Sequence, residues 1–527
     1  MAVEILESCM VTPSEATPKH GVWLSNLDLL VARGHTPTVY IYRPSSGPAS
    51  FSPDVRKAAL SRALIPFYPL AGRLAQDDAG RPEISCSGEG VLFVTERADS
   101  TLDVLGDFAP SDELRRTLVP SADASGLAGI LAMFQVTFFK CGGVCLGAAI
   151  HHTAADGLAA LDFVNAWAAI TRGDVGMPAA SPCLDRTLLG ARSPPSVLFD
   201  HAEYSRRGGG ETKPRVPFGS AILPMSKNQI DALKGGAGEG KRLSTFKAVV
   251  AHVWRCACKA RGLAATEDTR LYMTAEARTR VHPPLPRGYF GNAIFRASAA
   301  TKVGEVASGP LDAVAEKVTG ATARLDDEYV RSLLDHLELQ AADASGLRKG
   351  EWVMPETDLW VISWQGLPIY GASSGDPGAT KVSPAAATPS YIPFPRRHLR
   401  DAWQAPAAAD EGGGEASRRF VPARRTPDTG AAAPDGEAAQ PLRQAACAGC
   451  VGRSRRLLGR RIRRVVVVAR SSSAPDLKVE LLLLLCSLLP SGCVRSAAFA
   501  ASSGAGGVPV AYLESGGNPW SDLRPRQ

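Results

Sequence analysis

Apolar and polar residues in the first third of the chain recur with two different periods, which predicts both strands and helices. Two apolar runs at 130–139 and 144–150 flank a Lys-Cys-Gly-Gly turn, and this pattern indicates a hairpin. A helix with apolar residues at helical spacing is expected to begin near Leu158. The sequence His-His-Thr-Ala-Ala-Asp-Gly at 151–157 lies between them. Its histidines therefore stand where a strand ends and the chain turns.

The same patterns predict further elements on either side of this hairpin. Residues 39–42 are β-branched and aromatic and indicate a strand, whereas 54–64 indicates a helix that ends before Pro66. Residues 83–86 and 91–94 flank a Ser-Gly-Glu-Gly turn and are expected to pair as a second hairpin. The first part of the chain therefore predicts an α/β fold.

A stretch rich in Pro, Gly and charge follows, and beyond it the periodic patterns resume. Ser244 is a candidate helix cap, as is Ser226 for a shorter helix, and 314–339 is expected to be largely helical. Residues 271–275 and 359–363 are expected to be buried strands. These patterns predict a second globular unit.

The chain divides by composition into four parts. We expect an N-terminal domain at 1–190, a crossover linker at 191–220, a second domain at 221–372 and a tail at 373–527. The tail is rich in Ala, Gly, Pro, Arg and Ser and has poor periodicity. Because such a segment buries too little apolar surface to offset its ordering entropy, we expect it to be disordered.

Composition excludes several classes of protein. The chain has 527 residues, 45% of them apolar and 21% charged, with a net charge of +7. Much of the positive charge lies in one arginine-rich run at 453–464. Because this run contains no aromatic residues that could stack on bases, we do not expect a nucleic-acid partner. Binding of nucleic acid by this run is the third hypothesis. The 11 cysteines show no framework or metal-ligand spacing, and no segment has the pattern of a signal peptide or membrane span. We expect a cytoplasmic monomer without a bound metal.

His152 is the candidate catalytic residue. An imidazole has an ordinary pKa of about 6.5, so it can accept a proton at neutral pH. A histidine followed four residues later by an aspartate arises by chance in many proteins, so the spacing alone is weak evidence. A structural histidine at a strand end is the alternative.

Two further motifs accompany it, Phe67–Leu74 and Tyr289–Asn292, in which the chain reads Phe-Tyr-Pro-Leu-Ala-Gly-Arg-Leu and Tyr-Phe-Gly-Asn. With His152–Gly157, these motifs resemble the plant BAHD acyltransferases, which transfer acyl groups from coenzyme A to alcohols or amines. The stretches at 35–40, 107–110 and 252–261 resemble the hydroxycinnamoyl transferases within that family. The resemblance covers about residues 3–372.

The resemblance implies a two-domain coenzyme A-dependent acyltransferase fold, which is chloramphenicol acetyltransferase-like. It also implies a channel between the domains with His152 midway along it. Acyl-CoA would be a co-substrate and the acceptor a small molecule, with no permanently bound cofactor. His152 would be the general base, and Asp156 would turn away from it to pair with Arg278 in a structural role. Gly157 is expected to permit the turn that follows.

The acceptor side of the site is expected to involve His35, Thr36, Thr38 and Tyr40, whose counterparts border the acceptor pocket in hydroxycinnamoyl transferases. Alternation along a strand puts Thr36, Thr38 and Tyr40 on one face, although an ordinary half-buried strand is as good an interpretation. His151 is expected to point away from His152 and to pack or hydrogen-bond. Shikimate-using relatives carry arginine where this chain has Gly366, so a neutral or cationic acceptor is expected.

The chain departs from the family after Tyr370. It reads Gly-Ala-Ser-Ser-Gly-Asp at 371–376 where the family has Asp-Phe-Gly-Trp-Gly soon after this point. We interpret the break as a reading-frame shift or a mis-assembled gene sequence, which transcript sequencing tests. The second domain is then expected to be incomplete, with an exposed sheet edge. The alternative function is accordingly an inactive relic of an acyltransferase.

Overall fold

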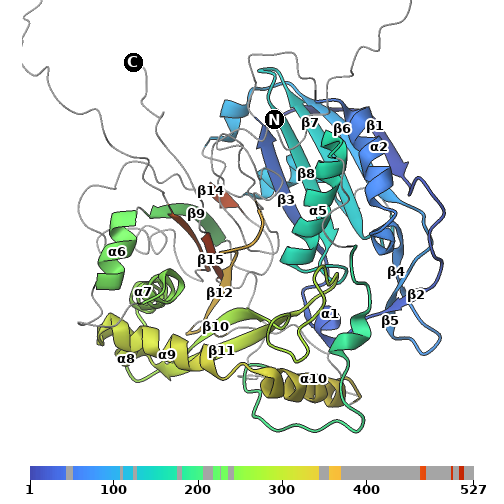
Figure 1. Ribbon diagram of the computed structural model, residues 1–527. Helices are drawn as coiled ribbons and strands as arrows, with labels where there is room; N and C mark the ends of the chain where they lie inside the picture. Colours follow the sequence, from blue (N-terminus) through green and yellow to red (C-terminus); the bar gives the residue numbers. More distant parts are fainter. Residues whose placement is uncertain are drawn as a thin grey trace, which may run out of the picture.

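The fold is built on two large β-sheets and one small sheet, with helices packed against the large sheets (Figure 1). The computed structural model describes residues 1–42, 51–106, 111–122, 127–174, 181–205, 218–225, 227–235, 243–342, 355, 357–369, 463–470, 500–502 and 510–514. No helix among these described residues is both long and apolar enough to cross a membrane.

The first sheet has the order β1-β6-β7-β8-β3. Its strands are β1 (Val3–Val11), β3 (His35–Tyr42), β6 (Val91–Ala98), β7 (Ala132–Phe139) and β8 (Val144–His151). The hairpin expected around the Lys-Cys-Gly-Gly turn is confirmed as β7 and β8, which pair antiparallel. Strand β3 pairs with β8 on its other side, with His35 opposite His151. The end of β8 is therefore held between two strands.

Helices α2 (Pro53–Ala63) and α5 (Gly157–Arg172) cover one face of this sheet, as Figure 1 shows. Trp167 on α5 is fully buried, and its indole N–H donates to the carbonyl of Arg56 on α2 at 3.0 Å. Its ring meets that of Phe134 from β7 edge to face, with centroids 4.8 Å apart. Burying a large aromatic ring against a sheet is a major source of stability, and here it fixes the helix that follows the histidine motif.

The expected hairpin of residues 83–86 and 91–94 is wrong. Strand β5 (Pro82–Ser85) joins the small sheet between β2 (Gly21–Trp23) and β4 (Arg73–Gln76), whereas β6 pairs with β1 and β7 in the first sheet. The chain turns from the small sheet to the first sheet at Gly90, where φ is +92°. A Cβ added to this residue would lie 2.4 Å from the carbonyl oxygen of Val11. The glycine-containing turn therefore redirects the chain between sheets instead of closing a hairpin.

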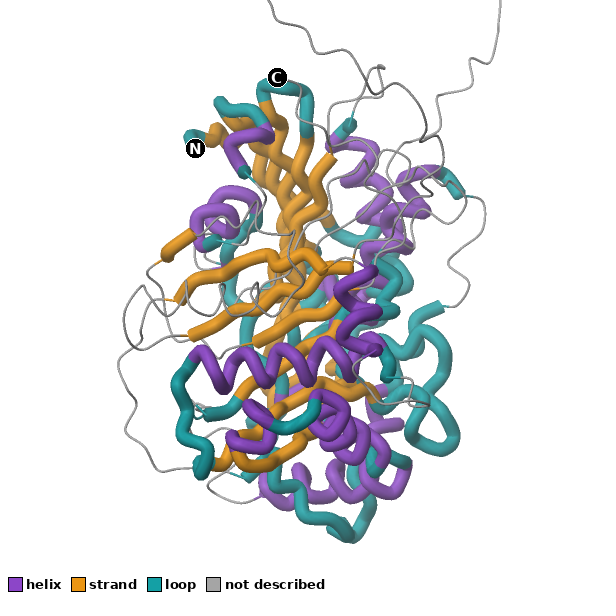
Figure 2. Tube along the Cα trace, turned by 90° about the vertical axis from the view of Figure 1, so that its left-hand side faces the viewer, coloured by secondary structure: helices purple, strands orange, loops and turns teal. Residues whose placement is uncertain are grey.

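The second large sheet has the order β11-β10-β12-β15-β13-β9-β14. The strands before the tail are β9 (Phe218–Met225), β10 (Asp268–Glu276), β11 (Ile294–Lys302) and β12 (Leu359–Ser363). The sheet is flanked by α6 (Lys227–Gly235), α7 (Thr245–Ala260), α8 (Val303–Ser308) and α9 (Leu311–Ala323) (Figure 1). Figure 2, turned by 90°, shows helices lying against the strands. The Ser244 cap of α7 is confirmed, since its hydroxyl accepts from the Lys247 N–H at 3.2 Å; Ser226 lies outside the described residues.

The region expected to be largely helical at 314–339 is confirmed as helical, and it is divided between two helices. Helix α9 ends at Ala323, and α10 runs from Asp327 to Ala342. The side chain of Asp326 accepts from the Tyr329 N–H at 2.9 Å, so a capping aspartate begins a new helix here.

The shorter helices of the described chain are α1 (Asn26–Leu30), α3 (Asp112–Leu118), η1 (Tyr68–Ala71), η2 (Leu102–Leu105) and η3 (Arg186–Leu189).

Disorder is expected for the tail at 373–527, and three segments within it form strands of the second sheet. They are β13 (Arg463–Arg470), β14 (Ala500–Ser502) and β15 (Val510–Glu514). Strand β15 pairs parallel with β12 and antiparallel with β13, and β13 pairs antiparallel with β9. Strand β13 is thus an interior strand paired on both sides, and its run of four valines at 465–468 has the β-branched composition typical of strands. The rest of 373–527 lies outside the described residues.

The edge of β12 is therefore covered, contrary to the expectation of an exposed edge at this point. Backbone groups of β12 from Trp360 to Ser363 face β15 from Val510 to Leu513. Segments from the end of the chain thus stand between β12 and β9. The sheet is continuous only when these tail strands are included.

Candidate active site

The histidine motif is a tight turn between β8 and α5 whose backbone is fixed by its neighbours. The His151 N–H donates to the carbonyl of Leu131 at 2.7 Å, and the His152 N–H donates to the carbonyl of Gly34 at 2.8 Å. His151 and the residues from 153 to 156 are buried, whereas His152 is half-buried. The turn therefore leaves one imidazole partly accessible while its backbone is rigidly held.

Asn292 contacts the imidazole of His152. Its side-chain oxygen lies 3.2 Å from Nδ1 of His152, and the asparagine is fully buried. Its Nδ2 donates to Oδ1 of Asp28 at 3.0 Å and to the carbonyl of His152 at 2.8 Å. Because the amide nitrogen faces two acceptors, the amide oxygen is the acceptor that faces the ring. This arrangement favours the tautomer with the proton on Nδ1 and a free lone pair on Nε2.

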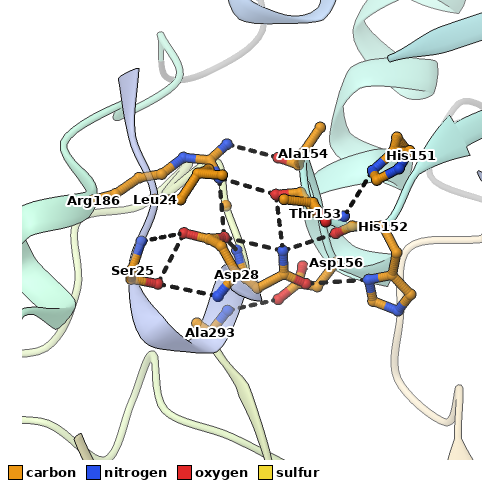
Figure 3. Close-up of polar contacts among 12 residues, drawn as sticks. Leu24, Ser25, Asp28, His151, His152, Thr153, Ala154, Asp156, Arg186 and Ala293 are labelled. Carbon is orange, nitrogen blue, oxygen red and sulfur yellow. Dashed lines mark hydrogen bonds and ion pairs between the residues drawn. The ribbon is translucent and has the colours of Figure 1, made fainter. Parts of the chain in front are cut away.

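Asp28 and Arg186 form a buried ion pair (Figure 3), and Asp28 also accepts from the side chain of Asn292. Nη1 of Arg186 lies 2.9 Å from Oδ1 of Asp28, and both side chains are almost completely buried. Arg186 also donates to the carbonyls of Thr153 and Ala154, at 3.2 and 2.7 Å. The pair therefore holds both Asn292 and the motif backbone. Sequence reasoning missed both residues, although Ser25 and Asp28 form a capping box for α1 that is a recognisable signal.

Asp156 points away from His152 and pairs with Arg278. The two guanidinium nitrogens lie 2.7 and 2.9 Å from its two oxygens. The carboxylate also accepts from the N–H of Ala159, which caps α5, and from the N–H of Ala293, both at 3.0 Å. Burial lowers the pKa of Arg278, but the Asp156 carboxylate, together with Tyr289 and Glu276, raises it overall. The pair joins the motif to the loop after β10.

Gly157 begins α5 where the end of β12 comes close. A Cβ at this position would lie 3.6 Å from Leu367 and 3.9 Å from Trp364. Trp364, Ile369 and Phe290 belong to the same buried cluster as residues of α5 and the first sheet. The motif therefore lies where the first sheet and the segments following β10 and β12 pack together. No group of three or more His, Cys, Asp or Glu side chains within the described ranges could hold a metal ion.

The β3 residues occupy different environments. His35 is half-buried, with Nε2 2.8 Å from the carbonyl of Ile130 and its ring edge-on to His151 at 5.1 Å. Thr36 and Thr38 are half-buried. Tyr40 is only 2% exposed and belongs to the core. Burial raises the pKa of its phenol, and the hydrogen bond with Thr38 acts in the opposite direction. Thr36 and Thr38 are thus the accessible members of that face.

His151 is held in the interior and does not share the environment of His152. The Thr153 N–H donates to its Nδ1 at 3.3 Å. Burial, with smaller contributions from His35 and His152, lowers the pKa of His151 to about 4. The ring is therefore neutral at pH 7 and packs against His35, in agreement with the expected packing role.

Known proteins share both sequence and fold with this chain. The family described as "Transferase family" matches residues 1–388. Putrescine hydroxycinnamoyltransferase 1 of Oryza sativa subsp. japonica is 75% identical over 393 residues, covering 71% of this chain and 88% of the relative. Shikimate O-hydroxycinnamoyltransferase of Nicotiana tabacum is 43% identical over 389 residues, with the same coverage.

Solved structures agree on the fold. Vinorine synthase superposes with a TM-score of 0.55 at 23% identity, covering 70% of this chain and 85% of that one. F. graminearum TRI101, in complex with ethyl coenzyme A, superposes with a TM-score of 0.54 at 17% identity, covering 67% and 85%. The α/β acyltransferase fold is thereby confirmed. The chain belongs to the BAHD acyltransferase family, in its hydroxycinnamoyl transferase-like branch.

Proposed function

We propose that this chain transfers a hydroxycinnamoyl group from coenzyme A to an aliphatic diamine, with His152 as the general base. The observation that carries the proposal is the contact of 3.2 Å between Nδ1 of His152 and the oxygen of Asn292. With the proton on Nδ1, Nε2 is the basic atom of the ring. A positioned base of this kind contributes about 10²–10⁴-fold to a reaction rate.

The reaction proceeds by direct transfer. The acceptor nitrogen, as a free amine, attacks the thioester carbonyl carbon while Nε2 of His152 takes one of its protons. The resulting tetrahedral oxyanion collapses, the carbon–sulfur bond breaks, and the imidazolium returns the proton to the departing thiolate. The amide and free coenzyme A are the products. Asp156 takes no part in proton transfer, because both of its oxygens are bound to Arg278 and backbone N–H groups.

Two observations support an amine acceptor. Gly366, where shikimate-using relatives carry arginine, has a φ of +86°. Apart from the two adjoining residues, no described residue has an atom within 4 Å of the place where a Cβ would be. No guanidinium is therefore available at 366 to bind an acceptor carboxylate. In addition, the relative with 75% identity is named for putrescine, a four-carbon diamine. We accordingly assign a diamine in preference to shikimate.

Thiol release from p-coumaroyl-CoA tests this function. The purified full chain is mixed with p-coumaroyl-CoA and either putrescine or shikimate, and the amide or ester is identified by mass spectrometry. Putrescine is expected to be acylated faster than shikimate, and His152→Ala is expected to abolish most of the release. Faster turnover of shikimate would contradict the assignment of the acceptor.

A second candidate function rests on the departure of the chain from its family after Tyr370. An inactive protein that still binds acyl-CoA is expected to show a saturable calorimetric signal with p-coumaroyl-CoA. It would release no thiol above background with any acceptor. This combination of results distinguishes it from the active enzyme.

A further inference from the structure

Asp28 is a buried carboxylate that lies one hydrogen-bonded amide away from His152 (Figure 3). Its Oδ1 accepts from the backbone N–H of Asn292 at 2.8 Å and from Nδ2 of the same residue at 3.0 Å. The oxygen of that amide lies 3.2 Å from Nδ1 of His152. The carboxylate, the amide and the imidazole therefore form one continuous hydrogen-bonded chain.

The orientation of the Asn292 amide decides which tautomer of His152 is favoured. Its Nδ2 faces oxygens that can only accept, namely Oδ1 of Asp28 and the carbonyl oxygens of His152 and Thr153. Turning the amide over would place its oxygen against these acceptors and its NH2 group against Nδ1 of His152. The ring proton would then be held on Nε2, the atom that must be unprotonated in a base. Asp28 therefore opposes the turn that would disable the base.

Asp28 is itself fixed through both of its oxygens. Its Oδ2 accepts from the backbone N–H and the hydroxyl of Ser25, at 2.9 and 2.8 Å. Its Oδ1 also lies 2.9 Å from Nη1 of Arg186, which in turn donates to the carbonyl of Thr153 in the motif. Buried polar groups that are satisfied by their neighbours are rigid, because any movement would leave one of them without a partner. The carboxylate is therefore a fixed acceptor against which the amide is oriented.

We propose that Asp28 is a positioning residue for acyl transfer, which holds His152 in its basic tautomer through the amide of Asn292. This inference rests on the proposed function and adds the carboxylate that supports its general base. When Nε2 takes the proton of the acceptor, the amide oxygen stabilises the imidazolium, and the carboxylate polarises the amide in the favourable direction. The supporting role that a catalytic triad would give to Asp156 thus belongs to Asp28, one amide further from the ring.

Asp28→Asn removes the charge and keeps the shape of the side chain. Because Asp28 is completely buried, it cannot contact either substrate, so its loss should act on kcat. The kcat for p-coumaroyl-CoA and putrescine is expected to fall about 10- to 100-fold, with KM changed by less than about twofold. Asp28→Glu, which keeps the charge, should recover part of kcat. A folded Asp28→Asn protein with the kcat of the parent chain would overturn the inference.

A double variant keeps the test decisive if the single one does not fold. Asp28→Asn leaves the Arg186 guanidinium buried without its counter-charge, which destabilises the protein. Asp28→Asn combined with Arg186→Gln removes both charges and avoids that cost. This protein is expected to fold and to have a similarly reduced kcat. If it folds and retains the kcat of the parent chain, Asp28 is not a positioning residue.

Asp335→Asn is the matched control. Asp335 is also a completely buried carboxylate paired with an arginine, but its hydrogen bonds go to Arg192 and Ser196 and not to the histidine motif. Its loss should lower the melting temperature and leave kcat unchanged. An equal fall of kcat in this variant would show that the loss of a buried carboxylate is sufficient by itself, and it would overturn the specific role of Asp28.

The tautomer of His152 gives a readout that needs no turnover. The full chain with nitrogen-15-labelled histidine is compared with Asp28→Asn by NMR at about pH 8, where an ordinary imidazole is neutral. The signals of His152 are assigned by their loss in His152→Ala. Nε2 is expected to be unprotonated in the parent chain, whereas Asp28→Asn should show both tautomers. Identical His152 signals in the two proteins would overturn the inference even if thiol release were established; a parent chain that releases no thiol would contradict the proposed function instead.

Discussion

Arg278 and Asp156 form a bidentate ion pair between the loop after β10 and the start of α5, with both N–O distances below 3 Å. The carboxylate is fully buried, and the guanidinium is nearly so. The aspartate of the histidine motif thus fastens the turn that carries His152 to the loop that carries Asn292. Its position relative to His152 supports a structural role in place of a catalytic triad.

Breaking this pair is expected to destabilise the protein strongly. Arg278→Ala leaves the Asp156 carboxylate buried with only its two backbone donors, and removing one partner of a buried pair costs about 3–5 kcal/mol. Chemical denaturation measures the loss of unfolding free energy. Arg97→Ala, which breaks an exposed pair with Glu4, is the control and should cost less than about 1 kcal/mol. Equal losses for the two variants would show that the pair contributes little.

Asn292 is expected to act on kcat through the orientation of His152. Asn292→Ala removes the acceptor at Nδ1 and permits the other tautomer, so kcat should fall by about 10²-fold or more with little change in KM for acyl-CoA. The side-chain hydrogen bonds from Nδ2 to Asp28 and to the carbonyl of His152 are also lost, so the melting temperature should decrease. Steady-state kinetics at a temperature where the variant is folded separate the two effects. A variant that is less stable but has unchanged kcat would contradict the orienting role.

The tail strands should be needed for the second sheet. Ending the chain after residue 388 removes β13, β14 and β15, and so exposes the edges of β12 and β9. Unpaired edges promote aggregation and lower stability. The truncated protein is expected to melt at a lower temperature and to aggregate, as measured by light scattering. A truncated protein with unchanged melting would show that the tail strands contribute nothing to the fold.

The sequence predicted the elements around His152 well because their signals are local. The hairpin of β7 and β8 has alternating and continuous apolar runs about a glycine turn, and α5 has helical spacing and an aspartate cap. The pairing of Asp156 with Arg278 was implied by the family resemblance alone. The hairpin assigned to 83–94 was wrong because a local turn pattern does not specify which sheet each strand joins.

The residues that support the site could not be found in this way. Asn292 and Asp28 are 264 residues apart, and Arg186 lies in a stretch without periodic pattern, so their contacts appear only once the chain is folded. Buried charges that satisfy each other leave no hydrophobic signal. The strands at the end of the chain were missed for a related reason, because low-complexity composition hides short β-branched segments.

Replacement of His152 decides whether its imidazole is the general base. Release of coenzyme A from p-coumaroyl-CoA in the presence of putrescine is measured for the parent chain and for His152→Ala, with folding of both verified by circular dichroism. Loss of the general base predicts a kcat lower by about 10²–10⁴-fold, with binding of p-coumaroyl-CoA retained. A folded His152→Ala protein that turns over at the rate of the parent chain would show that His152 is not the general base.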